Sequence, residues 1–189
     1  MKSHHSFITR KKTLASSTLF PTEQSEVKPD EIFQDIFQSG NKKNPIKPLS
    51  IYDVDNLNPR LFEAFVAALY AKQGYQVYLT PFANDKGVDI VALNSQNNYL
   101  IQAKQSQSTV SNDAIQEVFT SKNYYSSHFS EDFQMTVLTN NKFGGSAKTL
   151  ATSTNVELLD KDNLHSLLNE FPVSIKEVHQ HEAQRLKRI

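Results

Sequence analysis

Apolar residues between positions 58 and 74 recur at the spacing of an amphipathic helix. Asn58 can cap the start of this helix, Pro59 suits its first position, and Gly74 suits a left-handed exit. The apolar positions that form the helical stripe are Leu61, Phe62, Phe65, Val66, Leu69 and Tyr70. The pattern therefore predicts one well-delimited helix in this part of the chain.

Strand and helix signals alternate along the rest of the chain. Short apolar or alternating runs predict five strands, over residues 75–80, 88–93, 99–104, 135–139 and 156–159. Apolar residues recur at helical spacing in three further segments. One begins after Ser111, one spans residues 147–151, and one begins after Asp160. Ser111 can cap the first of these helices, whose apolar positions include Ile115 and Phe119. The order α-β-β-β-α-β-α-β-α predicts an α/β fold with a mixed central sheet flanked by helices.

The chain divides into four regions. Residues 1–28 are polar and lack periodicity, which predicts a flexible N-terminal arm, with a cleaved targeting sequence as the alternative. Residues 29–54 predict a short helix and a linker, and residues 55–170 predict the globular domain. Residues 171–189 predict an amphipathic helical tail, which packs on the domain or pairs with a second copy in a homodimer.

Composition excludes several classes of protein. Apolar residues make up 38% of the 189 positions. The longest unbroken apolar stretch, residues 64–71, is far shorter than the roughly 20 residues that a membrane-spanning helix needs. The absence of cysteine excludes disulfides, a thiol nucleophile, a cysteine-ligated zinc ion and an iron–sulfur cluster. The sequence therefore predicts a protein without a membrane span, and a reducing cytoplasm suits it.

Charge is unevenly distributed, although twenty basic and twenty acidic residues cancel. Residues 51–170 carry eight Lys or Arg against thirteen Asp or Glu, a balance of −5, whereas both flanking regions are basic. A basic surface is one sign of passive nucleic-acid binding, and the central region lacks it. An acidic region suits an enzyme whose site holds metal ions, because bound cations change the local field.

Polar residues with catalytic potential interrupt two of the predicted strands. Asp89 lies between Val88 and Ile90, where a buried carboxylate is costly unless it is paired or binds a metal. Gln102 and Lys104 are two positions apart in the next strand, so their side chains share one face. A turn-forming segment makes the two strands hairpin neighbours. We therefore expect Asp89, Gln102 and Lys104 to converge on one edge of the sheet.

This group suits the hydrolysis of phosphodiester bonds. Mg²⁺ prefers oxygen ligands, which the Asp89 carboxylate, the Gln102 amide oxygen and the Ala103 carbonyl can supply. Lys104 would orient or deprotonate the attacking water, and Glu63 on the first helix could reach the site through a water. Simpler interpretations exist: Asp89 pairs with a lysine at a strand end, Lys104 is a solvated edge-strand residue, or Glu63 is an exposed helix residue.

The motif formed by these residues resembles a known family. Asp89, twelve further residues and then Gln-Ala-Lys at 102–104 resemble the Mrr-type restriction endonuclease domain of the PD-(D/E)xK nuclease superfamily, in its variant with glutamine at the usual acidic position. The resemblance covers about residues 55–168 and implies a restriction-endonuclease-like α-β-β-β-α-β core. It also implies that the three polar residues of the motif are catalytic and that Glu63 takes the helix-borne acidic position.

The resemblance leads to two hypotheses of function. The first is a cytoplasmic DNA endonuclease that depends on Mg²⁺ or Mn²⁺ and acts in restriction, defence or DNA processing. The second is a nuclease-fold domain that binds nucleic acid or a protein partner without cutting. Catalysis requires Asp89, Gln102 and Lys104 to converge around a space the size of a cation, so their geometry distinguishes the two hypotheses.

Overall fold

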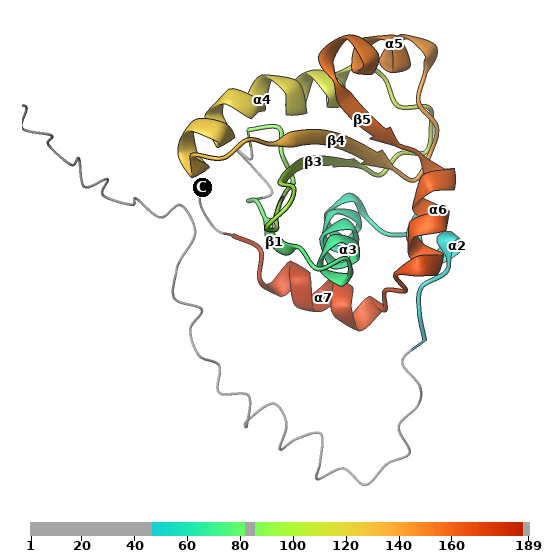
Figure 1. Cartoon of the computed structure of the whole chain (residues 1–189). Coiled ribbons are helices and arrows are strands. Elements are labelled where there is room, and N and C mark those ends of the chain that lie inside the picture. The colour runs from blue at the N-terminus through green and yellow to red at the C-terminus, as the bar shows by residue number, and fades with distance from the viewer. Residues whose placement is uncertain (1–46, 82–85, 187–189) are drawn as a thin grey trace, which may run out of the picture.

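The structure is a computed structural model in which residues 47–81 and 86–186 are described (Figure 1). The predicted arm at residues 1–28 and the short helix expected after it lie outside the described residues. The helices of the described residues are α2 (Ile51–Asp55), α3 (Pro59–Lys72), α4 (Asp113–Phe129), α5 (Gly145–Thr154), α6 (Lys161–Glu170) and α7 (Ile175–Ala183). Their strands are β1 (Gln76–Leu79), β2 (Ile90–Leu93), β3 (Tyr99–Lys104), β4 (Gln134–Thr139) and β5 (Val156–Leu159).

Five strands form one mixed sheet in the order β1-β2-β3-β4-β5. The first three strands form an antiparallel meander, in which Ile90 of β2 lies opposite Ile101 of β3. β4 pairs parallel with β3, and β5 pairs parallel with β4. Parallel neighbours need a crossover connection, which α4 and α5 supply. The structure confirms the predicted α/β fold with its mixed sheet.

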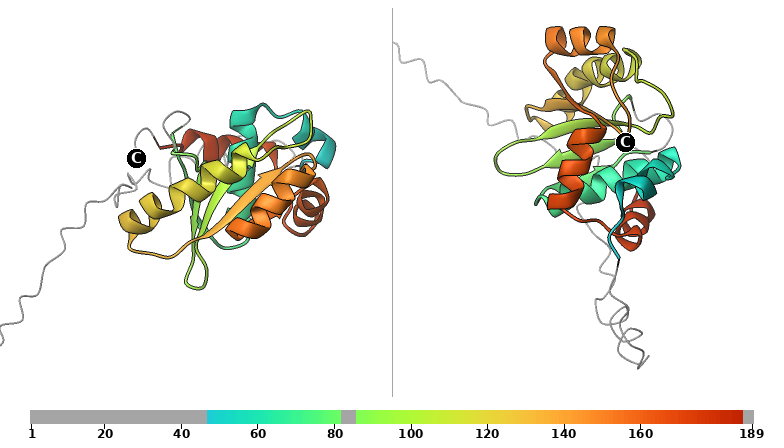
Figure 2. Two further views of the ribbon diagram at one scale, coloured as in Figure 1. Left: turned by 90° about the horizontal axis from the view of Figure 1, so that it is seen from above. Right: turned by 90° about the vertical axis from the view of Figure 1, so that its right-hand side faces the viewer.

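Helices cover both faces of this sheet, as Figure 1 and Figure 2 show. One hydrophobic core joins α3, α6 and α7 to the sheet residues Ile90 and Ile101. The other core joins α4 and α5 to Val91 and Leu100. Neighbouring residues of a strand point to opposite faces, so successive residues of β2 and β3 enter different cores. The central strands are therefore buried on both sides.

Helix α3 follows its predicted boundaries because the local signals act as expected. The Asn58 side chain accepts a hydrogen bond from the Leu61 N–H at 2.9 Å, Pro59 is the first helical residue, and Gly74 follows the helix with φ of +90°. All nine residues from 62 to 70 are buried. The sheet covers one side of α3 and α7 covers another (Figure 1). α3 is therefore a central core helix.

Two helices differ from the sequence prediction. α2 begins in the last residues of the region 29–54, which was predicted to hold a short helix and a linker, and Val54 on it is fully buried, so the packed unit includes the end of that region. α4 is preceded by Asn112, whereas the Ser111 hydroxyl donates to the Asp113 carboxylate instead of capping the helix. Phe119, expected on the apolar face of this helix, is 47% exposed. Periodicity identified the helix, but only packing shows how much of its face the sheet covers.

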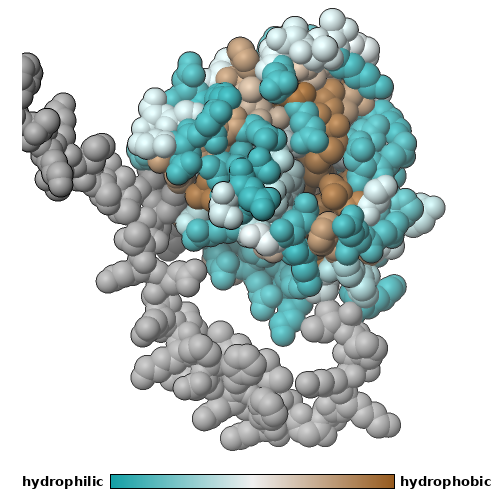
Figure 3. Space-filling model, viewed as in Figure 1, coloured by the Kyte–Doolittle hydropathy of each residue, from teal (hydrophilic) through white to brown (hydrophobic). Residues whose placement is uncertain are grey.

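The face seen in Figure 3 is mostly hydrophilic, with a band of apolar residues over β5. β5 is an edge strand, and three of its four residues are only partly buried or exposed. An edge strand lacks a neighbour on one side, which explains the incomplete cover. No helix within residues 47–81 and 86–186 is long and apolar enough to cross a membrane.

Candidate catalytic site

Asp89 lies directly before β2 and is buried. Its backbone N–H donates to the Ile101 carbonyl at 2.9 Å. Its carboxylate oxygen Oδ2 accepts from the Ala103 N–H at 2.7 Å. Regular pairing of β2 with β3 ends just before this point, and the Asp89 side chain takes the place of a backbone partner for β3 there. This bond places the Asp89 carboxylate beside the peptide that joins Gln102 to Ala103.

Gln102 and Lys104 share the face of β3 that is directed toward α4. Leu100 on the same face packs in the core under α4, while Ile101 and Ala103 belong to the core on the α3 side. Gln102 is 5% exposed, and its amide oxygen Oε1 has no hydrogen-bond partner within the described part of the chain. A buried acceptor without a donor is costly. This oxygen is therefore suited to a ligand from outside the protein.

Lys104 ends β3, and its ammonium group lies 2.7 Å from the Oε2 atom of Glu117 on α4. The Thr139 hydroxyl donates to the Lys104 carbonyl at 2.6 Å, and the Asn140 side-chain oxygen accepts from the Ser106 N–H at 2.8 Å. The end of β4 therefore holds the chain on both sides of the β3 terminus. Ligands of α/β sheets generally bind beyond the carboxyl ends of parallel strands, which is where Lys104 lies.

Glu63 lies on α3, on the opposite face of the sheet from Glu117. Its buried carboxylate accepts from Nη1 of Arg185 at 2.7 Å. The same Nη1 donates to the Thr80 carbonyl at 3.1 Å, and the Thr80 N–H donates to the Asp89 carbonyl at 2.9 Å. Glu63 is therefore linked to the backbone of Asp89 through Arg185 and Thr80.

Arg185 is held between acidic groups. Burial by itself lowers the pKa of its guanidinium, but the hydrogen bonds to Glu182 and the charge of Glu63 outweigh burial, so the pKa of Arg185 lies above its ordinary value. Burial raises the pKa of Glu182, but hydrogen bonds from Arg185 and Arg60 more than offset it, so that pKa lies below its usual range. The cluster is thus stabilised in its ionised form.

Sequence reasoning missed three residues of this region: Glu117, Asn140 and Arg185. Asn140 directly follows a predicted strand, a position that could have marked it as a residue of the sheet edge. Glu117 lies on an ordinary helical surface, and Arg185 lies in the predicted tail, so no local pattern distinguishes either one. Their roles depend on contacts with residues of other elements.

The donors beside Asp89 suit a hard divalent cation. The Asp89 carboxylate, the Gln102 amide and the Ala103 carbonyl all offer oxygen, the ligand that Mg²⁺ and Mn²⁺ prefer. Within residues 47–81 and 86–186 there is no group of three or more His, Cys, Asp or Glu side chains that could hold a metal. A cation here would therefore need amide and backbone oxygens in addition to the Asp89 carboxylate. The Gln102 Oε1 atom, which has no hydrogen-bond partner among the described residues, fits that requirement.

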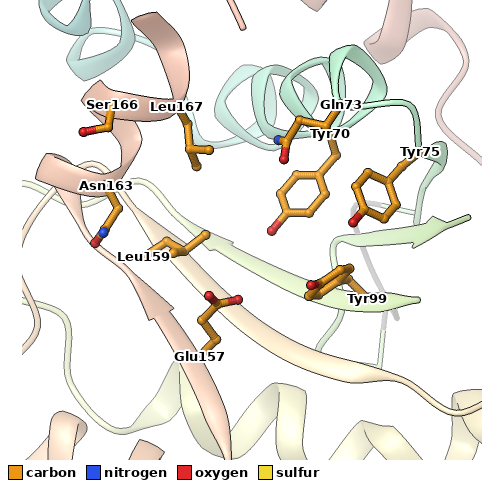
Figure 4. A pocket seen from close by; sticks show the side chains of 9 residues that line it. All are labelled: Tyr70, Gln73, Tyr75, Tyr99, Glu157, Leu159, Asn163, Ser166 and Leu167. Atoms are coloured by element: carbon orange, nitrogen blue, oxygen red, sulfur yellow. The ribbon is translucent and has the colours of Figure 1, made fainter. Parts of the chain in front are cut away.

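A pocket of about 300 Å³ lies at the other end of the sheet. In Figure 4, Tyr70, Tyr75 and Tyr99 form one side of this pocket, and the Glu157 carboxylate points into it from below. The three tyrosine rings contact one another edge to face, with centroids 5.6 to 6.0 Å apart. Tyr99 begins β3 and Lys104 ends it, a separation of roughly 17 Å along the strand. The pocket is therefore distinct from the candidate catalytic site.

The family of Mrr catalytic domains, described as restriction endonucleases, matches residues 54–168, a range that includes Asp89, Gln102 and Lys104. The chain belongs to this family. The match confirms the resemblance inferred from the sequence motif and identifies a nuclease domain of restriction type. The Mrr-type domain extends from α2 into α6, whereas α7 and Arg185 lie beyond the matched residues.

The chain is also similar to solved structures that include AF1548 and the MspJI restriction endonuclease. AF1548, a protein of unknown function, aligns with a TM-score of 0.51 and 19% identity over 60% of this chain and 66% of that one. The MspJI restriction endonuclease, in complex with a 27-mer oligonucleotide, aligns with a TM-score of 0.49 and 18% identity over 70% of this chain and 32% of that one. The chain thus spans less than two thirds of either protein. No curated protein matches the sequence.

Proposed function

We propose that the Mrr-type domain hydrolyses phosphodiester bonds of DNA with Mg²⁺ or Mn²⁺ held by Asp89, Gln102 and the Ala103 carbonyl. The observation that carries the proposal is the buried Gln102 Oε1 atom, which has no partner among the described residues and neighbours the peptide that binds Asp89. The bound cation would supply Lewis-acid stabilisation of the phosphate and a more acidic water. The description of the family as restriction endonucleases supports DNA as the substrate.

Lys104 acts on the attacking water in this proposal. Its side chain is 35% exposed at the carboxyl end of β3, so a phosphate can approach it from solvent. From this position the ammonium donates to the water and orients it, whereas deprotonation of the water would need the neutral amine form of Lys104. The ammonium charge also offsets the negative charge of the phosphate group.

Glu63 has an indirect role. Its carboxylate is bound to Arg185, and that guanidinium also holds the Thr80 carbonyl beside Asp89. Glu63 therefore supports the segment that carries Asp89, and it would reach a bound cation through a water. Residues that orient metal ligands in this way typically affect activity without binding the metal directly.

The test is a cleavage assay of the purified full chain on plasmid DNA with Mg²⁺, Mn²⁺ or EDTA. Lys104→Ala is expected to lower cleavage by roughly 10²–10⁴-fold, the usual contribution of a general acid–base group. DNA affinity should fall much less, because phosphate contacts spread over the surface supply most of the binding energy.

A matched control is Lys122→Ala, since Lys122 is similarly exposed but is ion-paired with Asp132 instead of Glu117. This variant should cleave like the wild type. Wild-type protein that binds DNA but shows no metal-dependent cutting of DNA or RNA would support the alternative, a nuclease-fold domain that binds without cutting.

A further inference from the structure

The ion pair between Lys104 and Glu117 joins the carboxyl end of β3 to α4. The Lys104 ammonium and the Glu117 Oε2 atom are 2.7 Å apart. Although the Glu117 side chain is 42% exposed, this particular oxygen is inaccessible to solvent, and it contacts Lys104 as an ion pair without the geometry of a hydrogen bond. One oxygen of the carboxylate is therefore shielded from water, whereas the lysine side chain that contacts it is 35% exposed.

The backbone of β3 fixes where the Lys104 side chain begins but not where it ends. The Lys104 residue pairs with Thr139 of β4, and the Thr139 hydroxyl also binds its carbonyl. A lysine side chain still has four flexible carbons between its backbone and its ammonium group. An ammonium that must meet a water or a phosphate needs a second constraint, and Glu117 is the carboxylate that contacts it in the described residues.

The turn of α4 that carries Glu117 also contacts the segment before Asp89. A Cβ atom on Gly87 would lie 2.8 Å from the Glu117 carbonyl, and Gly87 has φ of +76°, so only glycine fits this approach. One turn later, the Ser121 hydroxyl bonds to the Glu117 carbonyl at 2.8 Å and to the Lys86 carbonyl. One turn of α4 therefore contacts both the Asp89 segment and the Lys104 side chain.

We infer that Glu117 is a positioning residue that directs the Lys104 ammonium toward the reacting phosphate. The inference rests on the proposed nuclease function and adds to it a residue from outside the Asp-Gln-Lys motif. Glu117 does not touch the cation or the DNA in this role. It limits the positions of the Lys104 ammonium, and the docking of α4 on residues 86–87 keeps that ammonium in register with Asp89.

An ordinary surface ion pair would have the same distance but a different consequence. Exposed pairs contribute little to folding stability, and their loss leaves activity unchanged. A positioning pair changes the turnover number while leaving the stability and the substrate affinity nearly constant. Kinetic measurements on variants therefore distinguish a positioning pair from an ordinary surface pair, whereas the distance between the charges does not.

The experiment is a double-mutant cycle on the full chain, with Glu117→Gln, Lys104→Ala and the double variant measured under single-turnover conditions with excess protein. Glu117→Gln keeps the size of the side chain and removes its charge. We expect it to lower the limiting single-turnover rate constant by about 10–100-fold, as for other residues that orient a site, with the half-saturating concentrations of protein and of Mg²⁺ unchanged. Glu117→Asp, which keeps the charge, should recover part of the rate.

In the Lys104→Ala background, Glu117→Gln should have no further effect, because the group that Glu117 directs is gone. The control is Glu131→Gln, which removes one negative charge from an exposed residue that contacts Asn98 and not the site. This control should keep the wild-type rate and so separates positioning from a general change in DNA attraction.

Three results decide the inference. An equal loss of rate from Glu117→Gln in the wild-type and Lys104→Ala backgrounds would overturn it and assign Glu117 a structural role. A wild-type rate in Glu117→Gln would also overturn it, while leaving the proposed nuclease function intact. A wild-type protein that cuts no nucleic acid would refute the proposed function, and the inference with it.

Discussion

Two ion pairs flank the segment that carries Asp89, one on each face of the sheet. Glu63 and Arg185 meet on the α3 face, and Lys104 and Glu117 meet on the α4 face. The nitrogen–oxygen distance is 2.7 Å in both. The side chains of Glu63 and Arg185 are 10% and 5% exposed. Those of Lys104 and Glu117 are 35% and 42% exposed.

The two ion pairs therefore have the same nitrogen–oxygen distance but different physical roles. The Arg185 guanidinium also bonds to Glu182 and to the carbonyls of Thr80 and Arg60, so its charge is fully compensated inside the protein. Removing one member of such a buried cluster leaves a charge without water or a partner. The Lys104 side chain is 35% exposed, so its ammonium group can exchange Glu117 for a phosphate. The first pair suits stability, and the second suits chemistry.

The buried pair also joins parts of the chain that the family match separates. Glu63 lies within the matched residues 54–168, whereas Arg185 follows α7 beyond them. The Leu186 N–H bonds to the Leu79 carbonyl at 3.0 Å, which fixes this tail along the end of β1. In this protein the Mrr-type domain is therefore completed by a segment outside the family match.

Breaking the buried pair should have the largest effect on stability. Arg185→Ala leaves the Glu63 carboxylate buried without its cation, which is expected to lower the free energy of unfolding by about 3–5 kcal/mol. Urea denaturation followed by circular dichroism measures this change. Lys176→Ala, on the exposed side of α7, is the control and should change the free energy of unfolding very little. A loss below ~1 kcal/mol for Arg185→Ala would show that the pair is not structural.

A milder change at the same pair should have an intermediate effect. Glu63→Gln keeps an oxygen acceptor for Arg185 and leaves the bonds between Arg185 and Glu182 in place. We expect a loss of about 1–3 kcal/mol, the range for weakening a hydrogen bond to a buried charged group. The same variant tests the indirect catalytic role of Glu63. If the cleavage rate falls only in proportion to the fraction of folded protein, Glu63 has no catalytic role beyond stability.

Acid should loosen α7 before it unfolds the rest of the domain. Burial by itself raises the pKa values of Glu177 and Glu182. Hydrogen bonds from Lys72 and Ser174 outweigh burial at Glu177, and those from Arg185 and Arg60 outweigh it at Glu182. Folding therefore lowers both pKa values. A lowered pKa contributes stability that is present above the unfolded value, about 4.5 for glutamate, and is lost as the pH falls through the folded value.

Hydrogen exchange of the α7 amides between pH 7 and pH 3.5, corrected for intrinsic exchange rates, measures this effect. Protection of α7 should decrease at low pH, while that of β3 at the centre of the sheet decreases less. Equal changes in both elements would indicate that the two carboxylates do not hold α7 specifically.

The exposed pair should affect stability least. Lys104→Ala is expected to change the free energy of unfolding by about 0–1 kcal/mol, the range for solvent-exposed ion pairs. Urea denaturation under the conditions used for Arg185→Ala provides a direct comparison. A loss as large as that of Arg185→Ala would remove the distinction between the two pairs.

Local signals in the sequence determined the elements that carry the site. Asn58, Pro59 and Gly74 defined α3 because caps and backbone preferences act within one turn of the chain. The alternation of β3 placed Gln102 and Lys104 on one face, since the side-chain period of a strand is independent of its surroundings. The spacing between Asp89 and this strand sufficed to indicate the family, which the match to residues 54–168 confirms.

Only the tertiary structure decided which groups meet these residues. Arg185 reaches Glu63 across 122 positions, and Glu117 reaches Lys104 from a helix on the other side of a loop. The buried oxygen of Gln102 depends in the same way on what packs around it. Propensity and periodicity act over a few residues, whereas a contact between distant residues depends on how whole helices dock on the sheet. The sequence by itself therefore determined the strands and the motif, and packing determined the ion pairs on either side of Asp89.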